Sequence, residues 1–356
     1  MIHKSIKLTD QTINKSRVLV TGGAGFIGSN LCETLLFSDN EVICMDNFAT
    51  GKRENIQPLL SKPNFKLIEG DIRNYEDCKK AVDGCDIVLH QAALGSVPRS
   101  IQDPMTSTDV NIGGFVKMLH AASEAKVKRF VYAASSSTYG DHPDLPKKEH
   151  IIGKSLSPYA ITKYVDELFA ENFSAIYGIE TIGLRYFNVF GKNQDPFGAY
   201  AAVIPRFVSQ LIKHEPPVIN GDGSYSRDFT YIDNVVLANQ LAAVTPSQEL
   251  KERQNRYYQA LGKTAPGTDT LCEVFNVACG EQTSLLQLVN YLKDNLSVYD
   301  PLIAKLEPQF GPNRKGDVPH SLADISKGKS LFNYMPLYSV KEGLKNATSW
   351  YWENLK

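Results

Sequence analysis

The sequence predicts an α/β protein, with a doubly wound parallel sheet and a second, smaller α+β region. Three observations support this prediction. The first half repeats a short β-branched run, a turn and a segment with helical periodicity. A glycine-rich turn follows the first of these runs, and after about Asn188 glycine and proline become frequent and the repetition ends. We therefore expect the sheet domain over 17–188, with some later segments returning to it, and the smaller region over 189–356.

Each element follows from the spacing of its apolar residues. The expected strands are Arg17–Thr21, Glu41–Asp46, Lys66–Glu69, Ile87–His90, Phe130–Ala134 and Glu180–Arg185. The expected helices, with apolar residues three and four positions apart, are Phe26–Leu36, Gly113–Ala125 and Ala160–Tyr177. Because neither a repeat nor a long linker separates the two halves, we expect them to pack around a shared cleft.

Composition excludes several classes of function. The 356 residues carry a formal net charge of −1, so the chain as a whole attracts neither nucleic acid nor an anionic membrane. Its six cysteines form no C-x-x-C pair and are expected to be buried free thiols in a reducing compartment. The first sixteen residues contain no continuous apolar run, so we expect neither a signal peptide nor an anchor. The prediction is a cytoplasmic protein without a metal site.

The glycine-rich turn indicates a dinucleotide site. The strand Arg17–Thr21 leads through Gly22, Gly25 and Gly28 into a helix that begins near Phe26. Glycines let the backbone turn tightly and approach a pyrophosphate, whose charge is stabilised by the free N–H groups and dipole of the helix N-terminus. A glycine triplet alone also occurs in ordinary tight turns. In this context it predicts a Rossmann domain, with Phe26 and Ile27 at the cofactor.

An acidic residue at the end of the second strand favours NAD as the cofactor. Asp46 stands 21 positions after Gly25, where a carboxylate accepts hydrogen bonds from the adenosine ribose and repels a 2′-phosphate. The alternative for Asp46 alone is a turn residue at a strand end. Further cofactor residues are expected at the carboxyl edge of the sheet, namely Asn47, Asp71, Ile72, Gln91, Ala92 and Ala93. Asn111 is either another cofactor contact or a helix N-cap.

Ser135, Tyr159 and Lys163 form the predicted catalytic group. Ser135 ends a strand, Tyr159 follows 24 residues later, and Lys163 comes one helical turn after the tyrosine. A tyrosine hydroxyl is a poor base at neutral pH, but a nearby ammonium and a cationic cofactor favour the phenolate. The serine hydroxyl can then bridge the tyrosine and a reacting hydroxyl group. Y-x-x-x-K alone is weak evidence, because Tyr75 and Lys79 have the same spacing without an upstream serine.

Together these motifs resemble the extended short-chain dehydrogenase/reductases, and among them the nucleotide-sugar 4-epimerases. The stretches closest to the bacterial UDP-N-acetylglucosamine 4-epimerases are 46–51, 90–100, 133–141 and 185–191. The resemblance covers nearly the whole chain. It implies that Tyr159 is the base, that Lys163 holds the nicotinamide ribose, that Ser135 bridges the proton, and that the enzyme forms a homodimer.

The same resemblance implies a set of residues that bind a UDP-sugar, most of them in the smaller region and the others in the sheet domain. The expected set is Ser96, Ser136, Ser137, Asn188, Ala202, Val203, Asn220, Arg227, Arg314, Asp317 and Ser321. Arginines suit bidentate phosphate recognition, although each alone is more often a surface charge. Relatives that prefer a non-acetylated sugar have a tyrosine where this chain has Ser321. The smaller serine leaves volume for an acetamido group, so we expect interconversion of UDP-N-acetylglucosamine and UDP-N-acetylgalactosamine.

Three enzymatic alternatives and one non-enzymatic alternative remain open. The substrate could be the corresponding uronate or UDP-glucose and UDP-galactose, because the contacts to C6 are not visible in the sequence. A nucleotide-sugar 4,6-dehydratase would carry an Asp-Glu pair after the strand-end hydroxyl residue, where this chain has Ser136 and Ser137. A dinucleotide-binding sensor would not require the serine, tyrosine and lysine together. A turnover assay would distinguish an enzyme from such a sensor.

Overall fold

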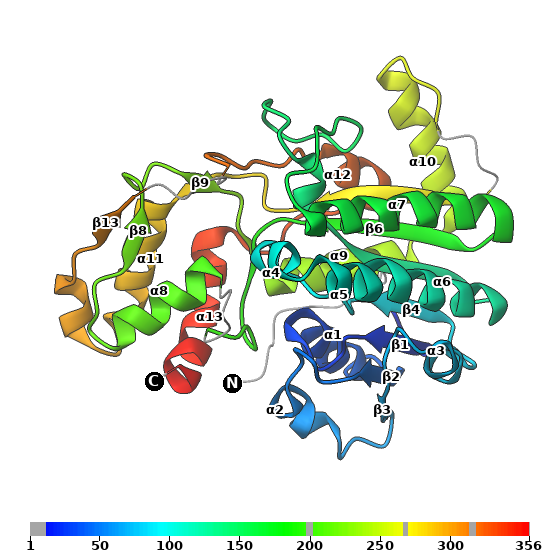
Figure 1. The fold of residues 1–356 in the computed structure, drawn as a ribbon, viewed down its shortest axis with the longest axis horizontal. Coiled ribbons are helices and arrows are strands. Elements are labelled where there is room, and N and C mark those ends of the chain that lie inside the picture. Colours follow the sequence, from blue (N-terminus) through cyan, green and yellow to red (C-terminus); the bar gives the residue numbers. More distant parts are fainter. Residues whose placement is uncertain (1–11, 197–201, 266–269, 313–317, 356) are drawn as a thin grey trace.

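The fold is built on a parallel sheet of seven strands in the order β11-β6-β5-β4-β1-β2-β3 (Figure 1). The computed structural model describes residues 12–196, 202–265, 270–312 and 318–355. The strands of this sheet are β1 (Arg17–Thr21), β2 (Glu41–Asp46), β3 (Phe65–Glu69), β4 (Ile87–His90), β5 (Arg129–Ser135), β6 (Glu180–Tyr186) and β11 (Cys272–Val277). The order reverses between β1 and β4, which is the place where open α/β sheets bind ligands.

Helices cover both faces of the sheet, which makes it doubly wound (Figure 1). The helices on one face are α1 (Phe26–Leu36) and α9 (Ile232–Val244), and those on the other are α3 (Tyr75–Val82), α6 (Phe115–Glu124) and α7 (Pro158–Tyr177). Successive side chains of a strand point to opposite faces. Accordingly Val18 and Val20 belong to one buried apolar cluster, whereas Leu19 belongs to the other.

The smaller region packs at one end of the sheet and shares the core of the α1 and α9 face (Figure 1). Its helices are α8 (Val203–Ile212), α11 (Leu285–Leu296) and α13 (Val340–Asn354). Its short strands pair as β7 (Val189–Phe190) with β10 (Thr230–Tyr231), β8 (Val218–Asn220) with β13 (Gln309–Gly311), and β9 (Ser226–Arg227) with β12 (Thr283–Ser284). A continuous core explains why no linker separates the two halves.

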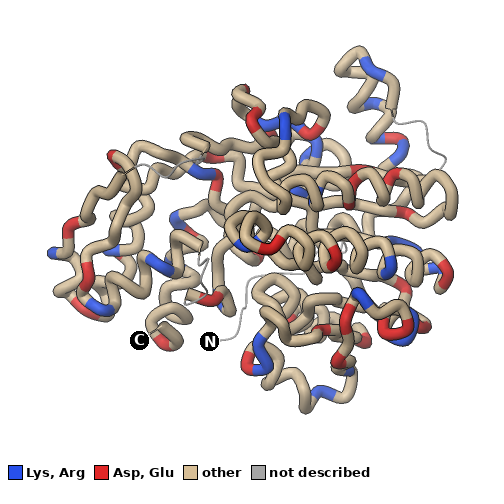
Figure 2. The backbone as a smooth tube through the Cα atoms, viewed as in Figure 1, with Lys and Arg blue, Asp and Glu red and all other residues tan. Residues whose placement is uncertain are grey.

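The remaining elements are short or peripheral. Helices α10 (Ser247–Ala260) and α12 (Ser326–Phe332) pack together beside β11. The short helices are α2 (Arg53–Ile56), α4 (Val97–Gln102) and α5 (Pro104–Thr108), and the tighter or wider turns are η1 (Gln57–Leu59), η2 (Asp109–Gly114), η3 (Ser136–Tyr139) and η4 (Pro301–Lys305). No helix in the described ranges is long and apolar enough to cross a membrane. Positive and negative residues are interspersed over both regions (Figure 2).

The structure confirms the predicted fold class, and the six predicted strands form to within a residue at each end. Helix α1 has the predicted bounds, and α7 begins two residues early, at Pro158. The helix expected from Gly113 begins instead at Phe115, because Asp109–Gly114 forms a wider helical turn. Such turns are frequent at functional sites. All six cysteines are free, as expected, although Cys272 and Cys279 are only partly buried.

Candidate active site

The glycine-rich turn between β1 and α1 is sterically restricted to glycine at two positions. Gly22 has a φ of +64°, and a Cβ there would lie 2.8 Å from the backbone nitrogen of Ala92. A Cβ on Gly28 would lie 2.1 Å from the carbonyl oxygen of Gly22. The helix N-cap, Gly25, provides no side-chain hydrogen bond to the first turn. The backbone amides at the start of α1 are therefore available to an anion such as a pyrophosphate.

Asp46 is fixed at the end of β2 beside this turn. Its carboxylate accepts hydrogen bonds from the backbone N–H groups of Ala24 (2.9 Å) and Phe48 (2.8 Å). Burial raises the pKa of Asp46, and these two bonds act in the opposite direction because they stabilise the ionised form. The carboxylate thus keeps one orientation at the edge of the cleft, as a ribose ligand requires.

A cleft of about 380 Å³ runs along the carboxyl ends of β1, β2 and β4. Its lining includes twelve of the predicted cofactor residues: Gly22, Gly25, Phe26, Ile27, Gly28, Asp46, Asn47, Asp71, Ile72, Gln91, Ala92 and Ala93. Small residues on the β4 loop leave this edge of the sheet open. The cleft therefore matches the expected dinucleotide site in both its position and its lining.

Arg73 also lines the cleft and was not predicted. Its guanidinium donates to the Asp71 carboxylate through Nε (3.0 Å) and Nη2 (2.7 Å), and Asn47 donates to the same carboxylate at 2.9 Å. These bonds hold the pKa of Asp71 well below its usual range. The missed signal was the arginine two residues after Asp71. The other unpredicted residues of the cleft are Met45, Ala49, Thr50, Gly70, Leu94, Gly95, Thr106 and Val110.

The side chains of Asn111 and Gln91, two predicted cofactor residues, form hydrogen bonds with other residues of the protein. Asn111 exchanges hydrogen bonds with the backbone of Leu94 and donates to the Thr162 hydroxyl at 3.1 Å, which holds the loop after β4 against α7. The N-cap alternative is wrong, because Asn111 lies inside the wide turn η2. The Gln91 amide bonds to Asn239 at 3.2 Å.

Ser135, Tyr159 and Lys163 come from β5 and the first turns of α7. The Ser135 hydroxyl oxygen accepts hydrogen bonds from the backbone N–H (3.1 Å) and the hydroxyl (2.8 Å) of Ser137. Both of its acceptor positions are thereby used, so its own hydrogen can be donated to an incoming group. The half-buried Tyr159 is held at the helix start by its N–H bond to the Ser100 hydroxyl (3.0 Å).

The Lys163 ammonium is buried and bonds to residues of β5 and α7. It donates to the carbonyl oxygen of Ala133 at 3.0 Å and to the Asp166 carboxylate at 3.2 Å. Its side chain is 4% exposed and that of Asp166 is 1% exposed. The lysine therefore has a fixed position one helical turn after Tyr159, with Asp166 as a counter-ion that the sequence did not indicate.

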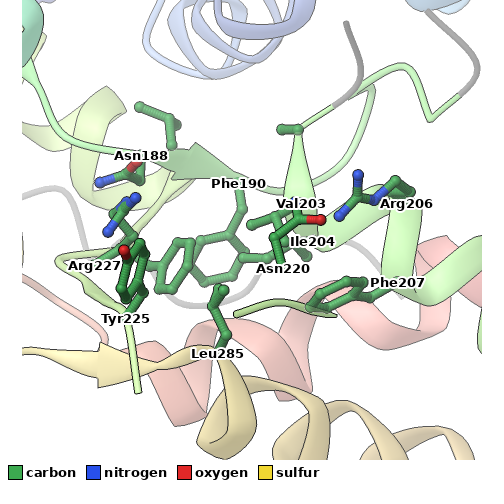
Figure 3. A pocket seen from close by; sticks show the side chains of 13 residues that line it. Asn188, Phe190, Val203, Ile204, Arg206, Phe207, Asn220, Tyr225, Arg227 and Leu285 are labelled. Atoms are coloured by element: carbon green, nitrogen blue, oxygen red, sulfur yellow. The ribbon is translucent and has the colours of Figure 1, made fainter. Parts of the chain in front are cut away.

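A second pocket, of about 280 Å³, lies in the smaller region (Figure 3). Five of the predicted substrate residues line it: Asn188, Ala202, Val203, Asn220 and Arg227. Arg227 and Asn188 stand at one end and Asn220 at the other, with Phe190 and Leu285 between them (Figure 3). Polar groups at both ends of an apolar centre suit a molecule with one flat ring and one charged part.

Several unpredicted residues complete this pocket: Val189, Ile204, Arg206, Phe207, Tyr225 and Phe229, besides Phe190 and Leu285. The guanidinium of Arg206 points toward Asn220 (Figure 3). Its signal in the sequence was a cation three residues after the predicted Val203. The aromatic residues come from β7, from α8, from the loop after β8 and from the segment before β10, so local pattern could not predict that they converge.

The remaining predicted substrate residues that the structure describes, Ser96, Ser136, Ser137 and Ser321, do not line either pocket. Ser96 caps α4 by accepting a hydrogen bond from Arg99 N–H at 3.2 Å, whereas Ser136 and Ser137 begin the turn after β5. Ser321 is half-buried, and its N–H bonds to the carbonyl oxygen of Ser226, the neighbour of Arg227, at 3.0 Å. Arg314 and Asp317 lie outside the described residues.

The first cleft fits a bound dinucleotide, because its glycines leave a cradle that a Cβ would fill and Asp46 stands at its edge. Residues 18–256 match the NAD-dependent epimerase/dehydratase family. Among solved structures, the UDP-N-acetylglucosamine 4-epimerase of Methanobrevibacter ruminantium, in complex with UDP-N-acetylmuramic acid, is 34% identical with a TM-score of 0.83, over 95% of this chain and 99% of that chain.

Two further solved structures are similar over nearly their whole length. The UDP-glucose 4-epimerase of Thermotoga maritima with UDP-glucose is 34% identical, with a TM-score of 0.81, over 96% of this chain and 100% of that chain. The UDP-glucuronic acid 4-epimerase of Bacillus cereus, with UDP-glucuronic acid and NAD, is 30% identical with a TM-score of 0.78, over 95% and 99% of the two chains. The three relatives share C4 epimerisation and differ in the sugar.

Proposed function

The chain belongs to the NAD-dependent epimerase/dehydratase family, and from that premise we propose that it interconverts UDP-N-acetylglucosamine and UDP-N-acetylgalactosamine. Relatives that act on three different UDP-sugars are similarly close, at 30% to 34% identity, so the sugar has to be inferred from the site. The observation that carries the proposal is the combination of the Ser135, Tyr159 and Lys163 group with the small residue Ser321 next to the nucleotide pocket.

Each residue of the group has a separate task. NAD, held by the glycine turn and Asp46, would supply hydride transfer from and back to C4 of the sugar. Tyr159 takes the proton of the 4-hydroxyl group and gives it back, while Ser135 donates its hydrogen bond to the same oxygen. Lys163 favours the tyrosine phenolate by its charge and holds the nicotinamide ribose. Because the hydride returns, the reaction needs no second redox partner.

The nucleotide pocket anchors the substrate while the hexose turns over. In this proposal Arg227 binds the diphosphate, with Asn188 and Asn220 beside it, and the segment at Ala202 and Val203 contacts the uracil ring. Arginine suits this task because its planar donors match phosphate oxygens. Placing most of the binding energy in the remote nucleotide leaves the sugar free to present either face to the cofactor.

Ser321 supports the acetylated sugar as the substrate. Its backbone bond to Ser226 places it beside the strand that carries Arg227, so it lies near the diphosphate end of the proposed substrate. A serine leaves volume at that position and offers a hydroxyl group to an acetamido oxygen. A tyrosine there would fill the same volume.

The test is a substrate panel without added NAD. Purified protein is incubated with UDP-N-acetylglucosamine, UDP-glucose and UDP-glucuronate, and the products are followed by proton NMR. We expect epimerisation at C4, with the acetylated sugar preferred. Ser321→Tyr should reduce turnover of the acetylated sugar at least about tenfold, the size of discrimination that pocket volume provides. Ser321→Ala is the matched control and should keep the preference. Equal losses on all sugars would refute the size argument.

We also propose that the enzyme is a homodimer formed through the α4, α5 and α7 face. Ile101, Met105, Ile161 and Leu168 expose between 46% and 82% of their surface there. Exposed apolar groups on neighbouring helices are typical of an interface. Light scattering should give twice the mass of the chain, and Leu168→Glu should shift it toward the monomer.

A further inference from the structure

Asp166 carries a charge that the proposed reaction does not use. Its Oδ2 atom lies 3.2 Å from the Nζ atom of Lys163. Lys163 precedes Asp166 by one turn of α7. Asp166 is 0% exposed and Lys163 is 3% exposed. A buried ammonium costs several kcal/mol unless it is paired with an opposite charge. The carboxylate of Asp166 therefore stabilises the charged form of the lysine at this depth.

The other charged groups around Asp166 are already matched. Glu167, the next residue on α7, forms a bidentate ion pair with Arg185 of β6, at 2.8 and 2.7 Å. Both of its oxygens are used in this pair. Asp166 is thus the carboxylate that balances Lys163.

The remaining titratable groups near the pair are neutral at physiological pH. Burial and the charge of Lys163 lower the pKa of His90, on β4, to about 3. Burial raises the pKa of Cys272, on β11, to about 11 and raises that of Tyr132, on β5, well above its usual value. The charges at this depth are therefore those of Lys163, of Asp166 and of the neighbouring Glu167–Arg185 ion pair.

Asp166 is only partly satisfied. Its Oδ1 atom is buried and has no hydrogen-bond partner in the part of the chain that the structure describes. Burial, the largest influence, raises the pKa of Asp166 to about 7 although Lys163 acts against it. Lys163 is therefore the main group that keeps this carboxyl group charged.

We propose that Asp166 is a positioning residue that holds the Lys163 ammonium and reduces its effect on Tyr159, so that its negative charge raises the pH at which Tyr159 acts as a base. The inference rests on the proposed function, in which Tyr159 is the base. An ammonium favours a nearby phenolate, and a carboxylate beside that ammonium opposes the effect. With a neutral group in place of this carboxylate, the lysine would act on the tyrosine at full strength.

The test compares two carboxylate-to-amide variants on one helix. Asp166→Asn keeps an oxygen for Lys163 and removes the charge, so the ascending limb of the pH–rate profile should move to lower pH by about one unit. Glu171→Gln removes a carboxylate from the exposed side of α7 and should leave the profile in place. If the amide variant does not fold, Asp166→Ser removes the same charge with a smaller side chain. It should shift the ascending limb in the same direction.

A second measurement requires neither sugar nor NAD. The ultraviolet difference spectrum between each protein and its Tyr159→Phe counterpart follows phenolate formation with pH, and its midpoint should move with Asp166→Asn as the rate profile does. An unchanged midpoint in folded Asp166→Asn and Asp166→Ser would overturn the inference. The inference would also be overturned if Asp166→Asn moved the midpoint by the same amount in a protein that carries Lys163→Met. A moved midpoint in a protein that epimerises no sugar would support this inference and refute the proposed function.

Discussion

Replacing Gly28 by alanine should weaken both the fold and the binding of NAD. The added Cβ would lie 2.1 Å from the carbonyl oxygen of Gly22 and 2.8 Å from the Cα atom of Gly23. Cβ atoms essentially never approach closer than 3.0 Å, and these neighbours are backbone atoms that cannot rotate away. The start of α1 must therefore move by roughly 1 Å, and overpacking of this kind costs about 1 to 3 kcal/mol.

The same displacement moves the amides that face the pyrophosphate. If NAD binding restores the native position, the cost of 1 to 3 kcal/mol corresponds to a dissociation constant about 5 to 150 times higher. Isothermal titration calorimetry measures the affinity, and urea denaturation measures the free energy of unfolding.

Gly113→Ala is the matched control for this variant. Gly113 also lies in a helical segment, but its added Cβ would be 3.4 Å from a movable atom, the Oδ1 of Asp109. Both variants make the same change to the unfolded chain, where alanine has less freedom than glycine. The reasoning would be refuted if Gly28→Ala bound NAD and unfolded like Gly113→Ala.

Three further predictions concern the site and its support. Tyr159→Phe should lower turnover by at least about 100-fold, the contribution of general base catalysis, and calorimetry should find NAD and UDP binding intact; unaltered turnover would contradict the role of the tyrosine. Glu167→Gln leaves Arg185 buried beside a neutral partner and should lower the free energy of unfolding in urea by about 3 kcal/mol; a loss within error of zero would contradict this. The pKa of His90 is about 3 in the folded protein, whereas its ordinary value is 6.5. Between these pH values only the unfolded chain binds the proton, so the free energy of unfolding decreases as the pH falls from 6.5 to 3. His90→Gln should show a weaker decline in urea unfolding over that range, and an identical decline in the two proteins would count against this reading.

Local pattern was sufficient for the first six strands and for the dinucleotide turn. Each buried parallel strand is a short β-branched run, and the predicted helices have apolar residues three and four positions apart. Both patterns lie within a few residues of sequence. The turn at Gly22 and Gly28 could be predicted for the same reason, since its chemistry requires glycines at fixed spacing. Asp46 followed from its distance to that turn.

Contacts between distant segments could not be predicted in this way. The strand Cys272–Val277 pairs with Glu180–Tyr186 and becomes the seventh strand of the sheet, although it lies in the half that lost the regular repetition. Its neighbour in the sheet is fixed by burial and hydrogen bonding across the fold, and its own residues do not specify that neighbour. The lining of the nucleotide pocket is of the same kind, because Phe190, Tyr225 and Leu285 converge from separate elements.

The βα units, the glycine turn and the spacing of the serine, tyrosine and lysine are encoded locally, because each depends on neighbours along the chain. Which charges are buried together depends on packing between distant segments. Asp166 stands three residues after Lys163 in the sequence, where a surface ion pair would look the same. The packing of α7 against the sheet removes that pair from water, and charges interact more strongly in the low dielectric there.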